Sequence, residues 1–338
     1  MEGTIVNDKV LALLEKYDIE VLRSWKGRGA ILCETKDGIK ILKEYKGSQD
    51  RLRMQKQMIE EIKEKGVYNI EQIMLTKEGE FIVKDEEMNT YCLKDYFVGK
   101  ECNIKEVQDC YQTVEQMAKL HKAMILPKFV EENQIKPFSL VKEFEKRTRE
   151  LKHVKKYLKS KHQKNEFEYF LYKNFDLFLQ KAESIAEEIK QYAEIFTEDN
   201  ILKKACICHG DFQHHNVVIT DQNLYFINFE KNILDSHMRD LSLFFRKVME
   251  KNNWKAEFGI NILESYQKEN ELTLEDRVQL YYRLSYPEKF WKIVNYYFGS
   301  SKVWIPAKNM EKFQNIINQE SEKNIFLNSY FKEQVLHK

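Results

Sequence analysis

The stretch CICHGDFQHHNVVITDQNLYFINFE, residues 206–230, has the residue types and spacing that phosphoryl transfer uses. Within it, Asp211 and Asn216 belong to an H-x-D-x-x-x-x-N pattern, and Asn228 and Glu230 follow two positions apart. A carboxylate can orient the proton of an attacking hydroxyl, and amide or carboxylate oxygens further along can hold the metal ion that binds the phosphates. We therefore interpret Asp211 as the candidate base and Asn216 as a metal ligand. Asn228 and Glu230 are the candidate ligands of a second metal position.

A strand, a loop and a hairpin are expected to position these groups. Residues 205–208 form a short apolar run and residues 217–219 are β-branched, so both segments are typical of strands. A turn at 220–223 then leads into a returning strand at 224–229. The base and the first metal ligand would lie in the loop before the hairpin, and the last two candidates would end the returning strand on one side of it. A chance match to the pattern in an ordinary hairpin is the alternative.

The same stretch resembles the catalytic loop of the protein-kinase-like phosphotransferases that act on aminoglycosides and choline, through H-G-D-F-x-x-x-N and the later I-N-F-E. Two blocks downstream narrow the resemblance to the CotS-type spore coat proteins, a branch of that fold. They are D-L-x-x-F-x-R-K from Asp240 and Y-P-E-K-F-W-K-x-x-N from Tyr286. The resemblance covers nearly the whole chain, and the second block is its most specific part.

This resemblance implies an α+β fold of two lobes. The small lobe, rich in β-strands and with one helix, would span residues 1–99. The large, mainly helical lobe would span residues 100–338, with the catalytic-loop hairpin at 206–230 and a helical insertion at about 140–190.

A nucleotide could be held by residues near the N-terminus. Gly27 and Gly29 form a turn between two predicted strands, and Lys43 lies on the third strand of the same meander. A lysine in that place can reach the α- and β-phosphates of ATP, beneath a glycine loop that covers them. An ordinary turn and a solvated lysine remain the alternatives, since glycine pairs and lysines are common in such positions.

The resemblance also implies a glutamate that holds the strand lysine and a hinge that meets adenine. The predicted helix at 49–65 offers Glu60 for the first role, with Glu61 as its competitor, and a plain surface charge is the alternative for either. Asp95 and Phe97 belong to the segment that resembles the hinge, where backbone groups would meet the adenine edge.

One departure from the pattern bears on activity. Active relatives carry aspartate where this chain has the neutral Asn228, while Glu230 keeps a carboxylate nearby. We therefore expect a spore coat protein with a kinase-like fold, which can be a degenerate kinase. The alternative is a phosphotransferase that uses ATP and Mg²⁺ to modify a hydroxyl of a small molecule.

Composition restricts the class of protein and its partners. The chain has 338 residues, of which 43% are hydrophobic and 32% charged, and its net charge of +1 gives no argument for nucleic acid. No apolar run approaches the roughly 18 residues of a membrane span, and the N-terminus lacks an apolar signal-peptide core. We expect an intracellular protein that joins the spore coat from the mother-cell cytoplasm, with other coat proteins or a small hydroxylated molecule as partners. The six cysteines contain no C-x-x-C pair and are expected to be reduced thiols.

Overall fold

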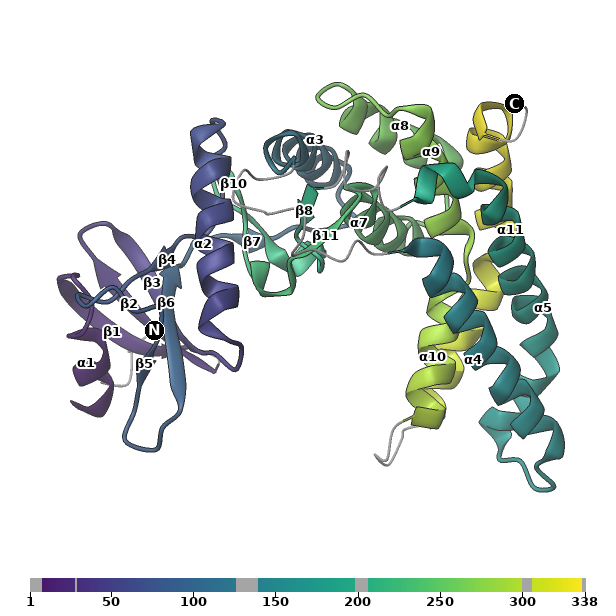
Figure 1. Cartoon of the computed structure of the whole chain (residues 1–338), viewed down its shortest axis with the longest axis horizontal. Helices are drawn as coiled ribbons and strands as arrows, with labels where there is room; N and C mark the ends of the chain where they lie inside the picture. The colour runs from purple at the N-terminus through teal and green to yellow at the C-terminus, as the bar shows by residue number, and fades with distance from the viewer. Residues whose placement is uncertain (1–7, 28, 126–138, 198–205, 300–305, 336–338) are drawn as a thin grey trace. The chain divides into compact units, whose positions relative to one another are not determined.

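The computed structural model of the protein describes residues 8–27, 29–125, 139–197, 206–299 and 306–335 (Figure 1). The chain forms two compact units, residues 1–129 with 209–233 and residues 130–208 with 234–338. The first unit contains the catalytic-loop hairpin together with the N-terminal sheet. This unit also includes the helix that follows residue 99, so its limits do not test the lobe boundary expected near residue 99, which stays a prediction.

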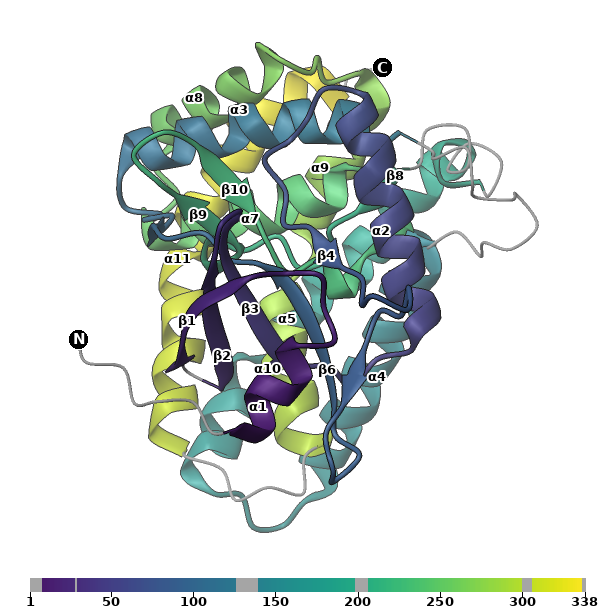
Figure 2. The same ribbon diagram turned by 90° about the vertical axis from the view of Figure 1, so that its left-hand side faces the viewer.

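An antiparallel sheet fills the first part of this unit, in the order β1-β2-β3-β6-β4, with β5 also paired to β6 (Figure 2). Left-handed backbone at Gly29 (φ +71°) and Gly38 (φ +101°) closes the two hairpins that join β1, β2 and β3, a conformation that glycine adopts without a steric cost. The bounds of the strands are Val21–Gly27 (β1), Ala30–Thr35 (β2), Gly38–Glu44 (β3), Ile73–Met74 (β4), Val83–Lys84 (β5) and Thr90–Asp95 (β6).

Two helices cover opposite faces of this sheet, as the period-two alternation of its strands requires. Leu42 packs into a cluster with residues of α1 (Asp8–Leu14), whereas Cys92 packs into a second cluster with Leu52 of α2 (Gln49–Glu64). Lys43 stands directly opposite Cys92 in the β3–β6 register, so it shares the α2 side of the sheet.

The catalytic-loop hairpin is shorter than the sequence suggests. β9 (Val217–Ile219) pairs with β10 (Leu224–Phe226) and with β7 (Lys100–Glu101), and helix α3 (Val107–Ala123) packs beside β10. The predicted strand to residue 229 is wrong in its last part. Asn228 is left-handed (φ +66°) and starts the 3₁₀ turn η4 (Phe229–Lys231), so Asn228 and Glu230 do not alternate along a strand.

The second unit is mainly helical and contains two long helices, α4 (Leu140–Ser160) and α5 (Glu166–Glu188), where the sequence predicts a helical insertion. Each begins at a side-chain cap, Ser139 for α4 and Asn165 for α5. The remaining elements are η2 (Ile189–Phe196), β8 (Cys206–Cys208), η3 (His214–Asn216, in the first unit), β11 (Ile233–Asp235), α7 (Met238–Lys251), α8 (Ala256–Gln267), α9 (Leu274–Ser285), α10 (Glu288–Gly299) and α11 (Pro306–Val335).

Aromatic side chains make much of the interior of this unit. Phe290 stacks on Phe178 with ring centroids 4.7 Å apart, and Tyr286 stacks on Phe144 at 4.2 Å. All six cysteines are buried and free, as expected for reduced thiols. No helix among the described residues is long and apolar enough to cross a bilayer.

Candidate active site

The catalytic loop is shaped by a buried histidine and a glycine. His209 is fully buried, its Nε2 donates to the Ile227 carbonyl at 2.9 Å, and its Nδ1 accepts from the Asp211 backbone N–H at 3.2 Å. Gly210 has φ +79°, and a Cβ there would lie 2.0 Å from the Lys231 carbonyl oxygen. Only glycine fits at that position, because the loop passes so close to the turn that follows the hairpin.

Asp211 presents a carboxylate that is already bound on both oxygens. Gln213 Nε2 donates to Oδ1 at 2.7 Å, and Lys231 Nζ lies 2.8 Å from Oδ2. Partial burial opposes ionisation of Asp211, but the hydrogen bonds from Lys231 and Gln213 and the Lys231 charge outweigh it and lower the pKa of the carboxyl. The candidate base is therefore an ionised carboxylate held in an ion pair.

The structure brings Asn216, Asn228 and Lys43 together beside this loop. Asn216 Nδ2 donates to the Asp211 carbonyl at 2.8 Å, which fixes the direction of the Asn216 oxygen. Asn228 Nδ2 then donates to Asn216 Oδ1 at 2.9 Å, and Lys43 Nζ donates to Asn228 Oδ1 at 3.4 Å. Both amide oxygens that were expected to bind metal accept hydrogen bonds from the protein itself.

A buried ion network supports the backbone at Asn228. Glu71 Oε1 accepts from the N–H groups of Asn228 at 2.7 Å and Phe229 at 3.3 Å, which holds the left-handed turn. Lys94 Nζ lies 3.3 Å from Glu71 Oε1 and 2.6 Å from Glu230 Oε1. The side chains of Lys94 and Glu71 are 2% and 4% exposed, so this network is inside the protein.

Charge pairing in this network overcomes the cost of burial. Burial disfavours charged Lys94, yet the Glu71 and Glu230 carboxylates raise its pKa above the usual range. Burial likewise disfavours ionised Glu230, yet the Lys94 charge lowers its pKa. Glu230 is thus the partner of a buried lysine in this structure.

Sequence reasoning missed Glu71 and Lys94. Lys94 shares its strand face with Cys92, which packs in the cluster under α2, and a lysine at such an inward position calls for a buried acidic partner. That signal was present in the pattern of β6. The identity of the partners was not, because Glu71 and Glu230 lie far away in sequence.

The remaining nucleotide candidates lie in several places on the first unit. Gly27 ends β1 and Gly29 closes the β1–β2 hairpin. Glu60 is exposed on α2 and pairs with Lys56 at 2.8 Å, whereas Lys43 donates to Asn228. Glu60 is exposed because it lies off the buried side of α2, which consists of Leu52, Gln55, Met58, Ile59 and Ile62.

The segment that resembles a hinge is held by its side chains. The Asp95 carboxylate accepts from Lys40 Nζ at 2.7 Å and from the Gln72 backbone N–H at 2.9 Å. Phe97 stacks on Tyr225 of the catalytic hairpin, with ring centroids 3.8 Å apart. These contacts join the segment to the sheet on one side and to the hairpin on the other.

The residues at the candidate metal position do not fit Mg²⁺ in this arrangement. Mg²⁺ favours octahedral oxygen coordination that includes carboxylates, and it keeps several of its waters. Here Asn216 and Asn228 supply neutral oxygens that are already bonded, and Glu230 is paired with Lys94. Among the described residues, no cluster of three or more His, Cys, Asp and Glu side chains could hold a metal ion.

Comparison with known proteins agrees with the resemblance seen in the sequence. A family model described as "Spore coat putative kinase YutH" matches residues 11–330. Spore coat protein S of Bacillus subtilis (strain 168) is 24% identical over 317 residues, which cover 89% of this chain and 86% of that protein.

Two solved structures with a similar fold are phosphotransferases. An aminoglycoside phosphotransferase from Alicyclobacillus acidocaldarius aligns with a TM-score of 0.83 at 17% identity, over 100% of this chain and 98% of that one. Spectinomycin phosphotransferase APH(9)-Ia, solved with ADP and spectinomycin, aligns with a TM-score of 0.62 at 13% identity, over 98% and 100% of the two chains. These matches confirm the predicted protein-kinase-like fold class. With the family model matching nearly its whole length, the chain belongs to the family of kinase-like spore coat proteins.

Proposed function

We propose that the protein is a spore coat component whose kinase fold serves as a structural domain and has lost magnesium-dependent phosphoryl transfer. The observation that carries this proposal is the Lys43–Asn228–Asn216 chain of hydrogen bonds. This chain of bonds supports the proposal because it joins an ammonium group and two amides at the residues that the resemblance assigns to the metal, where phosphoryl transfer would need carboxylate oxygen and a divalent cation.

The electrostatic argument can be given a magnitude. A divalent cation about 4 Å from the Lys43 ammonium is repelled by roughly 2 kcal/mol at a dielectric constant of 80 and roughly 8 kcal/mol at 20. An aspartate in place of Asn228 would offset that repulsion, but an amide carries no charge to do so. Glu230 cannot supply the charge without leaving Lys94 partly unpaired in a buried position.

Weak nucleotide binding without metal is compatible with this site. Lys43 and Lys231 are exposed lysines of the first unit, and ammonium groups can bind phosphate oxygens directly. Gly27 and Gly29 lie at the β1–β2 hairpin, at the place the resemblance gives to the loop over the phosphates. We expect ATP to bind weakly and with the same affinity whether or not magnesium is present.

A thermal-shift titration with ATP tests this proposal. Unfolding is followed with excess MgCl₂ and with EDTA, and a γ-phosphate hydrolysis assay is run on the same samples. We expect equal ATP-induced shifts in both conditions and no hydrolysis above a protein-free blank. A shift that requires magnesium, together with hydrolysis that disappears in Asp211→Asn, would overturn the proposal.

The second candidate function is phosphoryl transfer from ATP to a hydroxyl of a small molecule. It is favoured by Asp211 and Asn216, which keep the loop arrangement of a base and its neighbour, and by the exposure of Lys231. The Lys231 side chain is 70% exposed, so its pair with Asp211 contributes at most about 1 kcal/mol and can open readily. On this reading Asp211→Asn should cut turnover steeply while nucleotide affinity stays unchanged.

Location in the coat is part of the same proposal. We expect the protein to be made in the mother-cell cytoplasm and to join the spore surface through contacts with other coat proteins. A fluorescent fusion in a sporulating cell should mark the spore outline. A signal that stays diffuse in the mother cell after coat assembly would argue against the structural role.

A further inference from the structure

A basic stripe lies along one side of α4 in the second unit. It consists of Lys146, Arg149, His153 and Lys156, which follow one another at intervals of three or four residues and so share one side of the helix over about 15 Å. All four side chains are exposed. Within the ranges that the structure describes, no carboxylate pairs with any of them. The stripe therefore presents three cations and an imidazole that the fold itself does not use.

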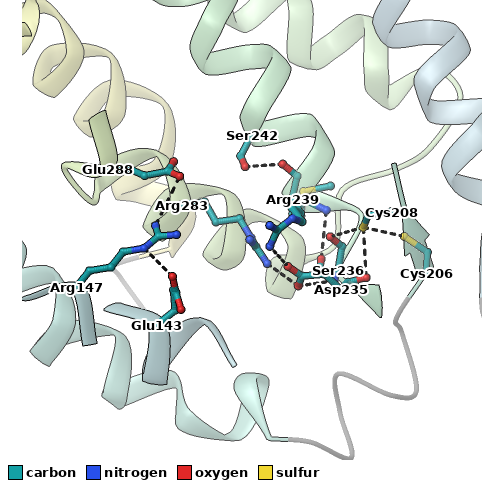
Figure 3. Close-up of polar contacts among 11 residues, drawn as sticks. Glu143, Arg147, Cys206, Cys208, Asp235, Ser236, Arg239, Ser242, Arg283 and Glu288 are labelled. Atoms are coloured by element: carbon teal, nitrogen blue, oxygen red, sulfur yellow. Dashed lines mark hydrogen bonds and ion pairs between the residues drawn. The ribbon is translucent and has the colours of Figure 1, made fainter. Parts of the chain in front are cut away.

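The cations on the other sides of α4 are paired. Arg147 Nε donates to Glu143 Oε1 at 2.8 Å, and its NH1 lies 3.6 Å from Glu288 Oε1 (Figure 3). Burial disfavours ionised Glu288, but nearby cations, chiefly Arg246, hold its pKa well below the usual range. Two lysines of α4 pair with carboxylates of α5 at 2.8 Å, Lys152 with Glu183 and Lys155 with Asp176. The contrast separates the stripe from the bases that hold the helix in place.

The stripe borders a groove between α4 and α10, two helices that pack together (Figure 1). The volume of the groove is about 400 Å³. Val154 and Phe298 give it an apolar floor, and the exposed Tyr157 meets the Phe298 ring edge-on, with ring centroids 5.8 Å apart. Its other lining residues are Lys146, Arg149, Glu150, His153, Asn295 and Gly299. The groove thus combines a basic rim on α4 with an apolar floor shared with α10.

One carboxylate lies in the lining, and a side chain of α10 binds it. Glu150 Oε2 accepts from Trp291 Nε1 at 2.7 Å. Glu150 forms no ion pair with Lys146 in the described part of the chain, although the two are one helical turn apart. The rim therefore carries an excess of positive charge, while a negative charge stays beside the floor. A ligand that fits must confine its own anions to the edge that faces the stripe.

We propose that this groove docks an acidic amphipathic helix of another protein. Carboxylates three or four residues apart on such a helix would face the stripe, and the apolar side chains beside them would cover Val154 and Phe298. Nucleic acid fits less well, because its evenly spaced phosphates would also meet Glu150. The inference rests on the proposed role as a coat component, for which it names the chemistry of the partner.

A designed helical peptide tests the groove. The peptide has Glu at the intervals of the stripe and Leu on the adjoining side, and its binding to the full-length protein is followed by fluorescence anisotropy at low ionic strength. A second peptide of the same composition has its Glu residues scattered around the helix. Lys146→Gln with Arg149→Gln removes two cations from the rim. Lys152→Gln with Lys159→Gln is the matched control, because it removes the same charge from exposed positions of α4 outside the groove.

We expect saturable binding of the patterned peptide by the wild type and by the control variant. The rim variant should bind it about tenfold more weakly, since two exposed ion pairs are lost, and the scattered peptide should show a similar loss with the wild type. Added salt should reduce the difference between the two variants. Phe298→Ala should weaken binding of the Leu peptide but not of a peptide with Ala in place of Leu, which assigns the effect to the floor.

Three outcomes would overturn the proposal. The first is no saturable binding of the patterned peptide by the wild type, or an equal loss in the rim and control variants. The second is tighter binding of an oligothymidylate that the rim variant loses, which would make the groove a nucleic-acid site. The third is a dimer of the protein alone, seen in sedimentation and dispersed by the rim variant, which would make a second copy of this chain the occupant.

This test can fail independently of the proposed function. The peptide titration uses neither nucleotide nor magnesium, so a groove without affinity for the peptide would leave the loss of phosphoryl transfer untouched. Conversely, magnesium-dependent ATP binding with hydrolysis would overturn the proposed function, while the affinity of the groove for the peptide would be unchanged.

Discussion

Replacing Asn228 with aspartate is the perturbation that most directly tests whether the neutral side chain at position 228 prevents magnesium binding. The amide of Asn228 donates to Asn216 Oδ1 at 2.9 Å and accepts from Lys43 Nζ at 3.4 Å. In Asn228→Asp the Nδ2 donor is lost, and a carboxylate oxygen of residue 228 then faces the Asn216 Oδ1 acceptor at about the same distance. Without metal we expect a cost of about 1 to 3 kcal/mol, offset by no more than about 1 kcal/mol from the exposed Lys43 pair.

Magnesium should reverse the sign of this effect. A divalent ion about 4 Å from the new carboxylate is attracted by roughly 8 kcal/mol at an effective dielectric of 20. Lys43 repels the ion equally in the wild type and in the variant, so the difference between the two proteins is this attraction reduced by the desolvation of the new carboxylate, which cancels most of it. A net gain of about 1.4 to 2.8 kcal/mol remains, which is ten- to hundred-fold in magnesium-dependent affinity for ATP.

Calorimetric titration with ATP, in MgCl₂ and in EDTA, gives the decisive numbers. The wild type should bind alike in both, and Asn228→Asp should bind ten- to hundred-fold tighter in magnesium only. Asn223→Asp is the matched control, because this substitution also replaces an amide with a carboxylate, but at an exposed position in the turn of the hairpin. Equal affinity of the wild type and Asn228→Asp in magnesium would refute the reasoning, since the Asn216–Asn228 pair would then not mark the metal position.

Three further outcomes follow from the buried contacts. Lys94→Met should destabilise the protein by about 3 to 5 kcal/mol in urea unfolding, because it leaves buried Glu71 unpaired. Gly210→Ala should lower the thermal midpoint by several degrees at least, since its Cβ would meet the Lys231 carbonyl at 2.0 Å in left-handed backbone, and an unchanged midpoint would contradict that geometry. Glu288→Gln should cost about 3 kcal/mol at pH 7. The pKa of Glu288 is lower in the folded protein than in the unfolded chain, so ionised Glu288 stabilises the fold above about pH 4.3 and this stabilisation is lost as the pH falls below it. The difference in unfolding free energy between the wild type and Glu288→Gln should therefore shrink as the pH falls below about 4.3.

The sequence predicts the order of strand, loop and hairpin around the catalytic loop because apolar runs and turn residues are local signals. It does not predict the contacts that shape the loop, because His209 bonds Ile227 and Gly210 lies against Lys231, both of which follow the hairpin turn. The returning strand was predicted too long, since alternation in Y-F-I-N-F-E does not reveal that Asn228 adopts a left-handed conformation. Asn tolerates that conformation better than most residues, so the signal was present but not decisive.

The sequence does not predict which charges pair, because pairing depends on where the elements pack. Glu230 looks like a metal ligand from its position two residues after Asn228, yet its partner in the structure is Lys94, which is 136 residues away. Glu60 shows the opposite case. Its exposure follows from the helical phase of Leu52, Met58 and Ile59, a pattern that the sequence already contains.

The distinction between a scaffold and an enzyme in this fold depends on two carboxylates with different freedom to act. Asp211 can be released from an exposed lysine at a small cost, so the candidate base remains chemically available. Glu230 is paired with Lys94, and Lys94 also pairs with Glu71, which holds the backbone N–H of Asn228. If Glu230 moved to bind a metal ion, it would therefore disturb the turn that positions Asn228, the other candidate ligand. Asp211 can therefore be present in the loop although no phosphoryl transfer takes place. For this reason the presence of Asp211 is weaker evidence for catalysis than the neutral side chain of Asn228 is against it.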